Sequence, residues 1–413
     1  MTFKNIAAGI CGLLLLQTSF AQTKLKTGVW RGALKTKSGT EIPFNFDVTN
    51  SGGKQQLAII NSTERFKVTD VVTKGDSVFI HMPLFNSEFK LKLNGENLSG
   101  NWVRHLADND LLIEFNATPN TPWRFFKDAE KPAANITGRW SAVFGEGASA
   151  DTTVGEFKQT GNKLTGTFLT TTGDYRFLEG SVSGNKLYLS TFDGGHAYTF
   201  TATINDDKTI TDGKFYAGYS AIEGWKAVKD ENAKLPDAYS LTSLKPGYKK
   251  IAFSFKDLEG KTVSLDDARF KNKVVIVQIL GSWCPNCMDE TGYMVNYYKK
   301  YHNKGVEVIG LAYERTTDFE KSKKALQQVK DRFNVTYPLL VTGYTSDKKQ
   351  TAESLPMLAK VVGFPTTIII DKNGDVQKIH TGFSGPGTGE HYTEFTHEFE
   401  KLTDDLLATT TAP

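Results

Sequence analysis

The segment Gly281-Ser282-Trp283-Cys284-Pro285-Asn286-Cys287 constrains this chain more than any other. It directly follows Lys273 to Leu280, a continuous apolar run typical of a strand that is covered on both faces. A disulfide between Cys284 and Cys287 would close a loop too small to stabilise the chain much. We therefore predict that the two cysteines serve redox chemistry.

The remaining cysteine, Cys11, lies in a predicted secretory leader, residues 1–21. Lys4 supplies the positive charge, residues 6–16 are apolar, and Ser19-Phe20-Ala21 has small residues at the cleavage spacing. An uncleaved anchor is disfavoured because the apolar run is short for crossing a bilayer. The sequence predicts an exported, periplasmic protein, cleaved near Ala21, with no integral membrane segment afterwards.

Length and charge narrow the architecture and the partners. The 413 residues, less the leader, suffice for two or three domains of ordinary size. The formal net charge is +3, from 49 basic and 46 acidic residues, and becomes +2 once Lys4 is removed. So small a bias gives no reason to expect nucleic acid or an anionic membrane as a partner.

Two successive blocks, residues 22–131 and 132–234, have the composition of antiparallel β domains. Short β-type runs alternate with turns rich in Gly, Asn and Asp. In the first block the predicted strands are Phe44–Val48, Gln56–Ile60, Ser77–Met82, Glu88–Leu93 and Asn97–Val103. The blocks open with Gly28-Val29-Trp30 and Gly138-Arg139-Trp140, 110 positions apart (138 − 28). We infer a tandem duplication.

The Gly-x-Trp opening is similar to the first strand of lipocalin-type barrels, although the match is one tripeptide. The favoured interpretation is a pair of small barrels or sandwiches whose tryptophans are core residues, because buried aromatics need no ligand to explain them. Residues 131–134 and 230–236 are the predicted linkers.

From residue 235 to 413 the pattern changes to strands that alternate with helices. The predicted elements after the first strand are a helix over 284–302, a strand over 306–312, a helix over 318–333, a strand over 366–371 and an amphipathic C-terminal helix. Such alternation predicts an α/β sheet with parallel strand pairs. The fold class is therefore multidomain: two all-β domains followed by an α/β domain.

Residues 237–407 resemble the thioredoxin superfamily, and within it the exported TlpA-like and ResA-like thiol-disulfide oxidoreductases. Three features carry the resemblance: the dithiol after a strand, Gly363-Phe364-Pro365-Thr366 entering a later strand, and the turn over residues 371–375 behind it. The resemblance implies an enzyme with a thioredoxin-like domain that exchanges disulfides with protein substrates.

The spacing of the dithiol suits this chemistry. A Cys284 at a helix N-cap would face unsatisfied backbone N–H groups, which favour thiolate over thiol. Pro285 would occupy the first helical turn, where its missing N–H costs nothing. Cys287, one turn further on, could attack a mixed disulfide at Cys284 and release the partner. Cys284 is the predicted nucleophile and Cys287 the resolving cysteine.

The resemblance also implies roles for residues beyond the cysteines. Pro365 would be cis and pack against the dithiol, and Phe364 would offer backbone hydrogen bonds to the substrate chain. Trp283 and Pro285 would shape the docking surface, although Trp283 could equally be ordinary packing.

ResA-like proteins carry a buried glutamate, and Glu314 lies near the corresponding point, where it could shuttle protons for Cys287. The alternative is a solvated loop charge. Gln278 stands where cytoplasmic thioredoxins have a buried aspartate. This departure removes one proton acceptor and so favours a role for Glu314.

The dipeptide between the cysteines, Pro-Asn, lacks the histidine of strongly oxidising relatives, so we expect a potential nearer the reducing end. The sequence predicts no cofactor and no metal: a zinc site would need more ligands than one cysteine pair. A separate membrane or periplasmic electron donor is implied.

Two other functions remain open from the sequence. A peroxiredoxin-like thiol peroxidase would share the wider fold, but the residues before Cys284 lack the usual peroxidatic pattern. The other is a binding or scaffold protein whose β repeats recognise a partner, with the redox domain ancillary.

Overall fold

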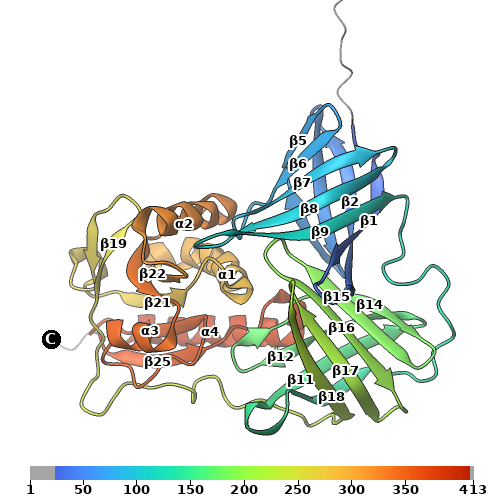
Figure 1. Ribbon diagram of the computed structural model, residues 1–413. Helices are drawn as coiled ribbons and strands as arrows, with labels where there is room; N and C mark the ends of the chain where they lie inside the picture. Colours follow the sequence, from blue (N-terminus) through green and yellow to red (C-terminus); the bar gives the residue numbers. More distant parts are fainter. Residues whose placement is uncertain (1–23, 410–413) are drawn as a thin grey trace, which may run out of the picture.

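The computed structural model describes residues 24–409, so the predicted leader, with Cys11, lies outside the described residues. Three sheets make up the molecule. Figure 1 shows two barrel-like β bodies, in blue and green, stacked beside an α/β body coloured yellow to red. No helix within residues 24–409 is long and apolar enough to cross a membrane.

The first barrel is a meander whose strands pair antiparallel in chain order. Its strands are β1 (Gly28–Lys35), β2 (Glu41–Ser51), β3 (Lys54–Asn61), β4 (Glu64–Val68), β5 (Asp70–Lys74), β6 (Ser77–His81), β7 (Ser87–Asn94), β8 (Asn97–His105) and β9 (Asp110–Pro119). β9 returns to pair with β1. Thr69 alone separates β4 from β5, and these two pair with β3 and β6 respectively. The sheet therefore curls round on itself.

The second barrel repeats this plan. Its strands are β10 (Gly138–Phe144), β11 (Asp151–Thr160), β12 (Lys163–Thr170), β13 (Gly173–Asp174), β14 (Leu178–Ser183), β15 (Lys186–Phe192), β16 (Ala197–Ile204), β17 (Thr209–Ala217) and β18 (Ala221–Lys229), with a 3-10 turn η1 at Gly147–Ser149. β18 pairs with β10, and β11 pairs with both β10 and β12. These pairings close the ring.

The two opening tryptophans occupy matching places. Trp30 and Trp140 are fully buried, and each indole Nε1 donates to the carbonyl four residues earlier, that of Lys26 at 2.8 Å and that of Ile136 at 2.9 Å. The expectation of core tryptophans is confirmed. The space left inside the first barrel is only about 10 Å³, so side chains fill it. We retain the tandem duplication, the domain boundaries and the likeness to lipocalin-type barrels as proposals.

The α/β body has a seven-stranded sheet in the order β20-β19-β23-β22-β21-β24-β25. The strands are β19 (Ser254–Asp257), β20 (Thr262–Ser264), β21 (Val274–Leu280), β22 (Val306–Glu314), β23 (Leu339–Thr345), β24 (Thr366–Ile370) and β25 (Val376–Thr381). The helices are α1 (Pro285–Tyr301), α2 (Phe319–Phe333), α3 (Lys348–Ser354) and α4 (Glu390–Ala408), with 3-10 turns η2 (Ala268–Phe270), η3 (His302–Lys304) and η4 (Pro386–Thr388). The predicted parallel pairs are present, because β22 runs parallel to both β21 and β23.

The barrels pack against each other through a buried interface. Phe192 of the second barrel stacks on Phe44 of the first, with ring centroids 4.4 Å apart. Between the barrels, the buried guanidinium of Arg124 donates to the carbonyls of Ile60 and Ser190. This packing fixes the two barrels relative to each other.

Candidate active site

The two cysteines lie where β21 passes into α1. Cys284 is the N-cap of α1, as predicted, and Pro285 is its first residue. Cys284 and Cys287 form a disulfide, and Cys284 Sγ accepts a hydrogen bond from Cys287 N at 3.2 Å. The outer sulfur therefore faces backbone N–H groups at the positive end of the helix, which would stabilise it as a thiolate once reduced.

The segment before β24 packs against the dithiol. The Phe364–Pro365 peptide bond is cis, as the resemblance implied, and Phe364 O lies 3.6 Å from Cys284 Sγ. Trp283 meets the ring of Phe364 edge-on at 5.4 Å and donates its indole N–H to Tyr313 O at 3.0 Å. The structure thus brings the cysteines together with Trp283, Phe364 and Pro365.

Glu314 ends β22 and is buried. Its Oε1 accepts from Ser282 N at 2.8 Å and its Oε2 from Ser282 Oγ at 2.7 Å. Burial raises the pKa of this carboxyl, and the two hydrogen bonds partly offset the rise. These contacts hold the loop that leads into Trp283. A proton shuttle from Glu314 to Cys287 stays a prediction.

A second buried carboxylate, which the sequence analysis missed, lies on α1 one turn beyond Cys287. Glu290 is fully buried, and it accepts from Gln278 Nε2 at 2.7 Å and from Thr367 Oγ1 at 2.6 Å. Burial raises its pKa to about 7 despite these hydrogen bonds. The sequence could have indicated Glu290, because residues three apart on a helix lie on one face and Glu290 follows Cys287 at that spacing.

The second barrel covers the dithiol. Residues 170–176, which we call the roof hairpin, lie over the start of α1 and the segment before β24. Asn286 Nδ2 donates to Asp174 O at 3.1 Å and to Asp174 Oδ2 at 3.3 Å. The Thr172 side chain leaves no room for a Cβ on Gly363. Under this roof Cys284 is 4% exposed and Cys287 is fully buried.

Arg176, at the end of the roof hairpin, joins the three bodies. Its guanidinium contacts Asp289 of α1 at 2.7 and 2.9 Å, Glu64 of the first barrel at 2.7 Å and Asp193 of the second at 3.5 Å. Although burial opposes the charged form, these carboxylates raise the pKa of Arg176 above its ordinary value.

Asp174 lies beside this ion-pair cluster. Burial, and then the charge of Asp289, raises the pKa of Asp174 to about 7. Its Oδ2 also accepts from Gly385 N at 2.8 Å, so the carboxyl ties the roof hairpin to the α/β body as well.

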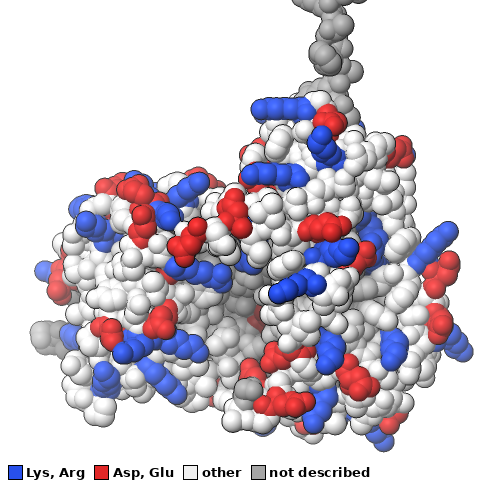
Figure 2. Space-filling model, in the orientation of Figure 1, with Lys and Arg blue, Asp and Glu red and all other residues white. Residues whose placement is uncertain are grey.

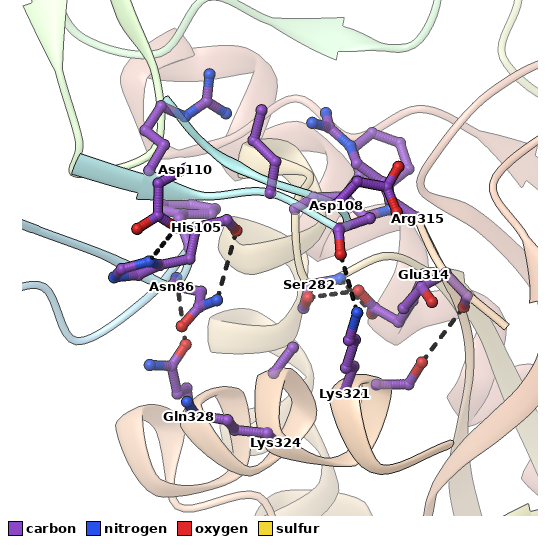
Figure 3. A pocket seen from close by; sticks show the side chains of 18 of the residues that line it. Asn86, His105, Asp108, Asp110, Ser282, Glu314, Arg315, Lys321, Lys324 and Gln328 are labelled. Atoms are coloured by element: carbon purple, nitrogen blue, oxygen red, sulfur yellow. Dashed lines mark hydrogen bonds and ion pairs between the residues drawn. The ribbon is translucent and has the colours of Figure 1, made fainter. Parts of the chain in front are cut away.

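Two hollows lie beside the dithiol segment, and Figure 2 shows the surface hollowed between the α/β body and the barrels. A cavity of about 290 Å³ lies against Cys284 and is lined by Tyr175, Tyr198, Trp283 and Phe364 among others. A groove of about 720 Å³ lies between α2 and the turn that joins β8 to β9 (Figure 3). Trp283 and His196 line both, so the groove and the cavity adjoin.

A family model, several curated proteins and several solved structures match this chain. The redoxin family model matches residues 232–394. Thioredoxin-like protein YneN of Bacillus subtilis is 32% identical over 139 residues, which are 34% of this chain and 73% of YneN. Thiol-disulfide oxidoreductase ResA of Bacillus cereus is 32% identical over 143 residues, 35% of this chain and 72% of that protein.

Among solved structures, the thioredoxin domain of a thiol-disulfide oxidoreductase from Bacteroides vulgatus is 28% identical and covers 38% of this chain and 99% of its own, with a TM-score of 0.29. The redoxin match begins at residue 232, after β18 has ended at Lys229. Both barrels therefore precede the matched region.

Proposed function

Because this chain belongs to the redoxin family, among its ResA-like thiol-disulfide oxidoreductases, we propose that Cys284 and Cys287 exchange disulfides with protein substrates outside the cytoplasm. The observation that carries the proposal is the disulfide at the N-terminus of α1, beside the cis peptide bond at Pro365. In this proposal Trp283, Pro285 and Phe364 form the surface that holds the substrate sulfur near Cys284.

The exchange needs two attacks. In the reduced protein, the Cys284 thiolate attacks a substrate disulfide, forms a mixed disulfide and releases one substrate sulfur as a thiolate. The Cys287 thiolate then attacks Cys284 Sγ, and the second substrate sulfur leaves. The two substrate sulfurs take up two protons and gain two electrons, while the protein becomes the Cys284–Cys287 disulfide. A separate dithiol donor must return the two electrons.

Cys287 must lose its proton before the second attack, because the thiolate is the nucleophile. We assign the acceptor role to Glu290, which lies one turn from Cys287 and whose pKa of about 7 suits proton exchange at neutral pH. Glu314, placed against Ser282, is the alternative. The expected effect of Glu290→Gln is a slower release of the mixed disulfide, with Glu314→Gln affecting the loop before Trp283 instead.

The direction we propose is reduction of substrates. No histidine stands between the cysteines to stabilise the thiolate, and the Asn286 amide is directed to Asp174. The reduced form therefore gains less stability than in a strongly oxidising relative, which lowers the reduction potential. Equilibration with glutathione measures this, and a strongly oxidising potential would contradict the direction but not the exchange itself.

Export to the periplasm, with cleavage near Ala21, remains part of the proposal, as does the separate electron donor. The direct test uses two variants. Cys284→Ser is expected to abolish reduction of insulin disulfides, and Cys287→Ser to accumulate mixed disulfides with substrates in cells. Full activity in Cys284→Ser would overturn the proposed function.

A further inference from the structure

The roof hairpin changes how a substrate can reach Cys284. A flat protein surface cannot lie across the dithiol, because Thr172 fills the space over Gly363 and Asp174 binds the Asn286 amide. The open space beside the dithiol lies to the side, in the cavity against Cys284 and in the groove that adjoins it at Trp283 and His196. An extended chain or a small molecule fits this route better than a folded surface does.

Two arginines line the groove: Arg104 of the first barrel and Arg315 of the α/β body, the latter labelled in Figure 3. Arg104 is the last residue but one of β8. Its Nε is buried without a hydrogen-bond partner among the described residues. Arg315 follows Glu314 and lies over the Trp283 ring, 5.0 Å from its centroid. One guanidinium therefore stands directly beside the residue that precedes Cys284.

The two guanidiniums are close enough to affect each other. Burial, followed by the positive charge of Arg315, lowers the pKa of Arg104. Within residues 24–409 neither arginine forms a salt bridge. It is unfavourable to leave the buried Nε of Arg104 unpaired, and it is unfavourable for two like charges to face one hollow. An anion bound between the two guanidiniums would accept a hydrogen bond and would offset the repulsion.

Most of the acidic side chains around the groove are already engaged. Glu314 accepts both hydrogen bonds from Ser282. Asp110 accepts from His105 at 2.7 Å. Asp193, whose charge reaches Arg104, pairs with His196 and Arg176. Asp108 is exposed at the tip of the β8–β9 turn. Among the described residues, no carboxylate forms a salt bridge with either arginine, although the charge of Asp193 acts on Arg104 and that of Arg315 acts on Glu314.

We propose that Arg104 and Arg315 bind a carboxylate of the disulfide substrate, so that the protein selects disulfides with an acidic group near the reacting sulfur. The inference rests on the proposed function and names its substrate class: an extended polypeptide segment with an acidic residue close to its cysteine. A small acidic disulfide would present the same chemistry.

The test compares matched substrates on the reduced, full chain. Two disulfide-bridged peptides differ only by Glu or Gln beside the cysteine, and the rate of disulfide reduction is followed in a single turnover. We expect the Glu peptide to react about tenfold faster, the size of one charge-assisted hydrogen bond. Arg315→Gln and Arg104→Gln should each reduce this preference. Arg65→Gln, an exposed arginine outside the groove, is the matched control and should keep it.

A second arm of the experiment compares oxidised glutathione with an ester of it in which all the carboxylates are blocked. A preference for the free acid there, without one among the peptides, would support the anion site and assign it to small disulfides. Equal rates within both pairs would overturn the inference while leaving the oxidoreductase intact. Absence of reduction of every substrate would instead refute the proposed function, and this comparison needs no variant to fold.

Discussion

The two barrels share a plan but differ after one turn, and that difference decides which of them reaches the dithiol. In the first barrel, β3 passes to β4 through two residues, 62 and 63, and Thr69 alone separates β4 from β5. In the second barrel, β12 also passes to β13 through two residues, 171 and 172, but β13 holds only Gly173 and Asp174, and three residues, 175–177, precede β14. A shortened strand and an irregular segment, with no residue added at the turn, thus make the second barrel a wall of the active site.

The first barrel contacts the α/β body through a different turn. Its β8–β9 turn reaches α2, where Lys321 Nζ donates to Ala107 O at 2.9 Å. The matching turn of the second barrel, between β17 and β18, contacts the first barrel instead, because Lys37 N donates to Tyr219 O at 2.7 Å. Each barrel therefore presents a different turn to the redox site.

The largest expected effect comes from the residue that joins the bodies. Arg176→Ala would leave Glu64, Asp193 and Asp289 buried without their shared cation. We expect the free energy of unfolding to fall by about 3–5 kcal/mol, measured by urea denaturation. Lys26→Ala, which removes an exposed ion pair with Glu96, is the control and should cost about 1 kcal/mol or less. Equal losses would mean that the cluster does not hold the bodies together.

The matched tryptophans test whether the barrels are equivalent as folds. Trp30→Phe and Trp140→Phe each remove a buried indole and one hydrogen bond to a carbonyl. We expect each to lower the free energy of unfolding by about 1–3 kcal/mol, and by similar amounts in the two barrels. Hydrogen exchange reports the unfolding of each barrel separately and so distinguishes the effects of the two substitutions. A large inequality would weaken the proposed duplication.

Two buried carboxyls, Asp174 of the second barrel and Glu290 of α1, should make stability depend on pH. Folding raises both pKa values to about 7. Their protonated forms are therefore favoured in the folded protein, so this contribution is fully present below about pH 4 and is lost as the pH rises through about 7. Stability at pH 5 should exceed that at pH 8 by more in the native protein than in Asp174→Asn or Glu290→Gln. Urea midpoints at both pH values measure the difference. His380, whose folded pKa is lowered to about 4, acts in the opposite sense but is common to all variants.

The sequence predicted the parts of the site that are local. Cys284 at an N-cap and Pro285 in the first turn follow from the rules for helix starts, and the predicted helix over 284–302 differs from α1 by one residue at each end. Helical spacing also places Glu290 one turn beyond Cys287, but the sequence analysis considered only Glu314 as the proton acceptor. The strand β23 was also missed, because its apolar run is short and Gly343 interrupts it.

The rest of the site depends on contacts that local patterns do not encode. Asn286 meets Asp174, 112 positions earlier in the chain, through a turn that the sequence marks only with Gly and Asp. The arginine pair combines residues from two bodies. The sequence therefore predicted the position of the dithiol at the N-terminus of α1 but not its enclosure, because enclosure arises from how the barrels pack on the α/β body.

The smallest effect should come from loosening the roof. Asp174→Ala removes the acceptors of Gly385 N and part of those of the Asn286 amide, while it leaves the cysteines and α1 in place. In the reduced protein we expect Cys284 to react a few-fold faster with a bulky maleimide than it does in the native chain, and to react with iodoacetamide at a nearly unchanged rate. The ratio of the two rates isolates access from thiol reactivity, since a change in the Cys284 pKa would alter both rates together. Asp206→Ala, an exposed turn residue of the same barrel, is the control and should leave the ratio as it is. If the ratio stays constant in Asp174→Ala, the first barrel or Thr172 limits access instead, and the contrast between the two turns loses its functional meaning.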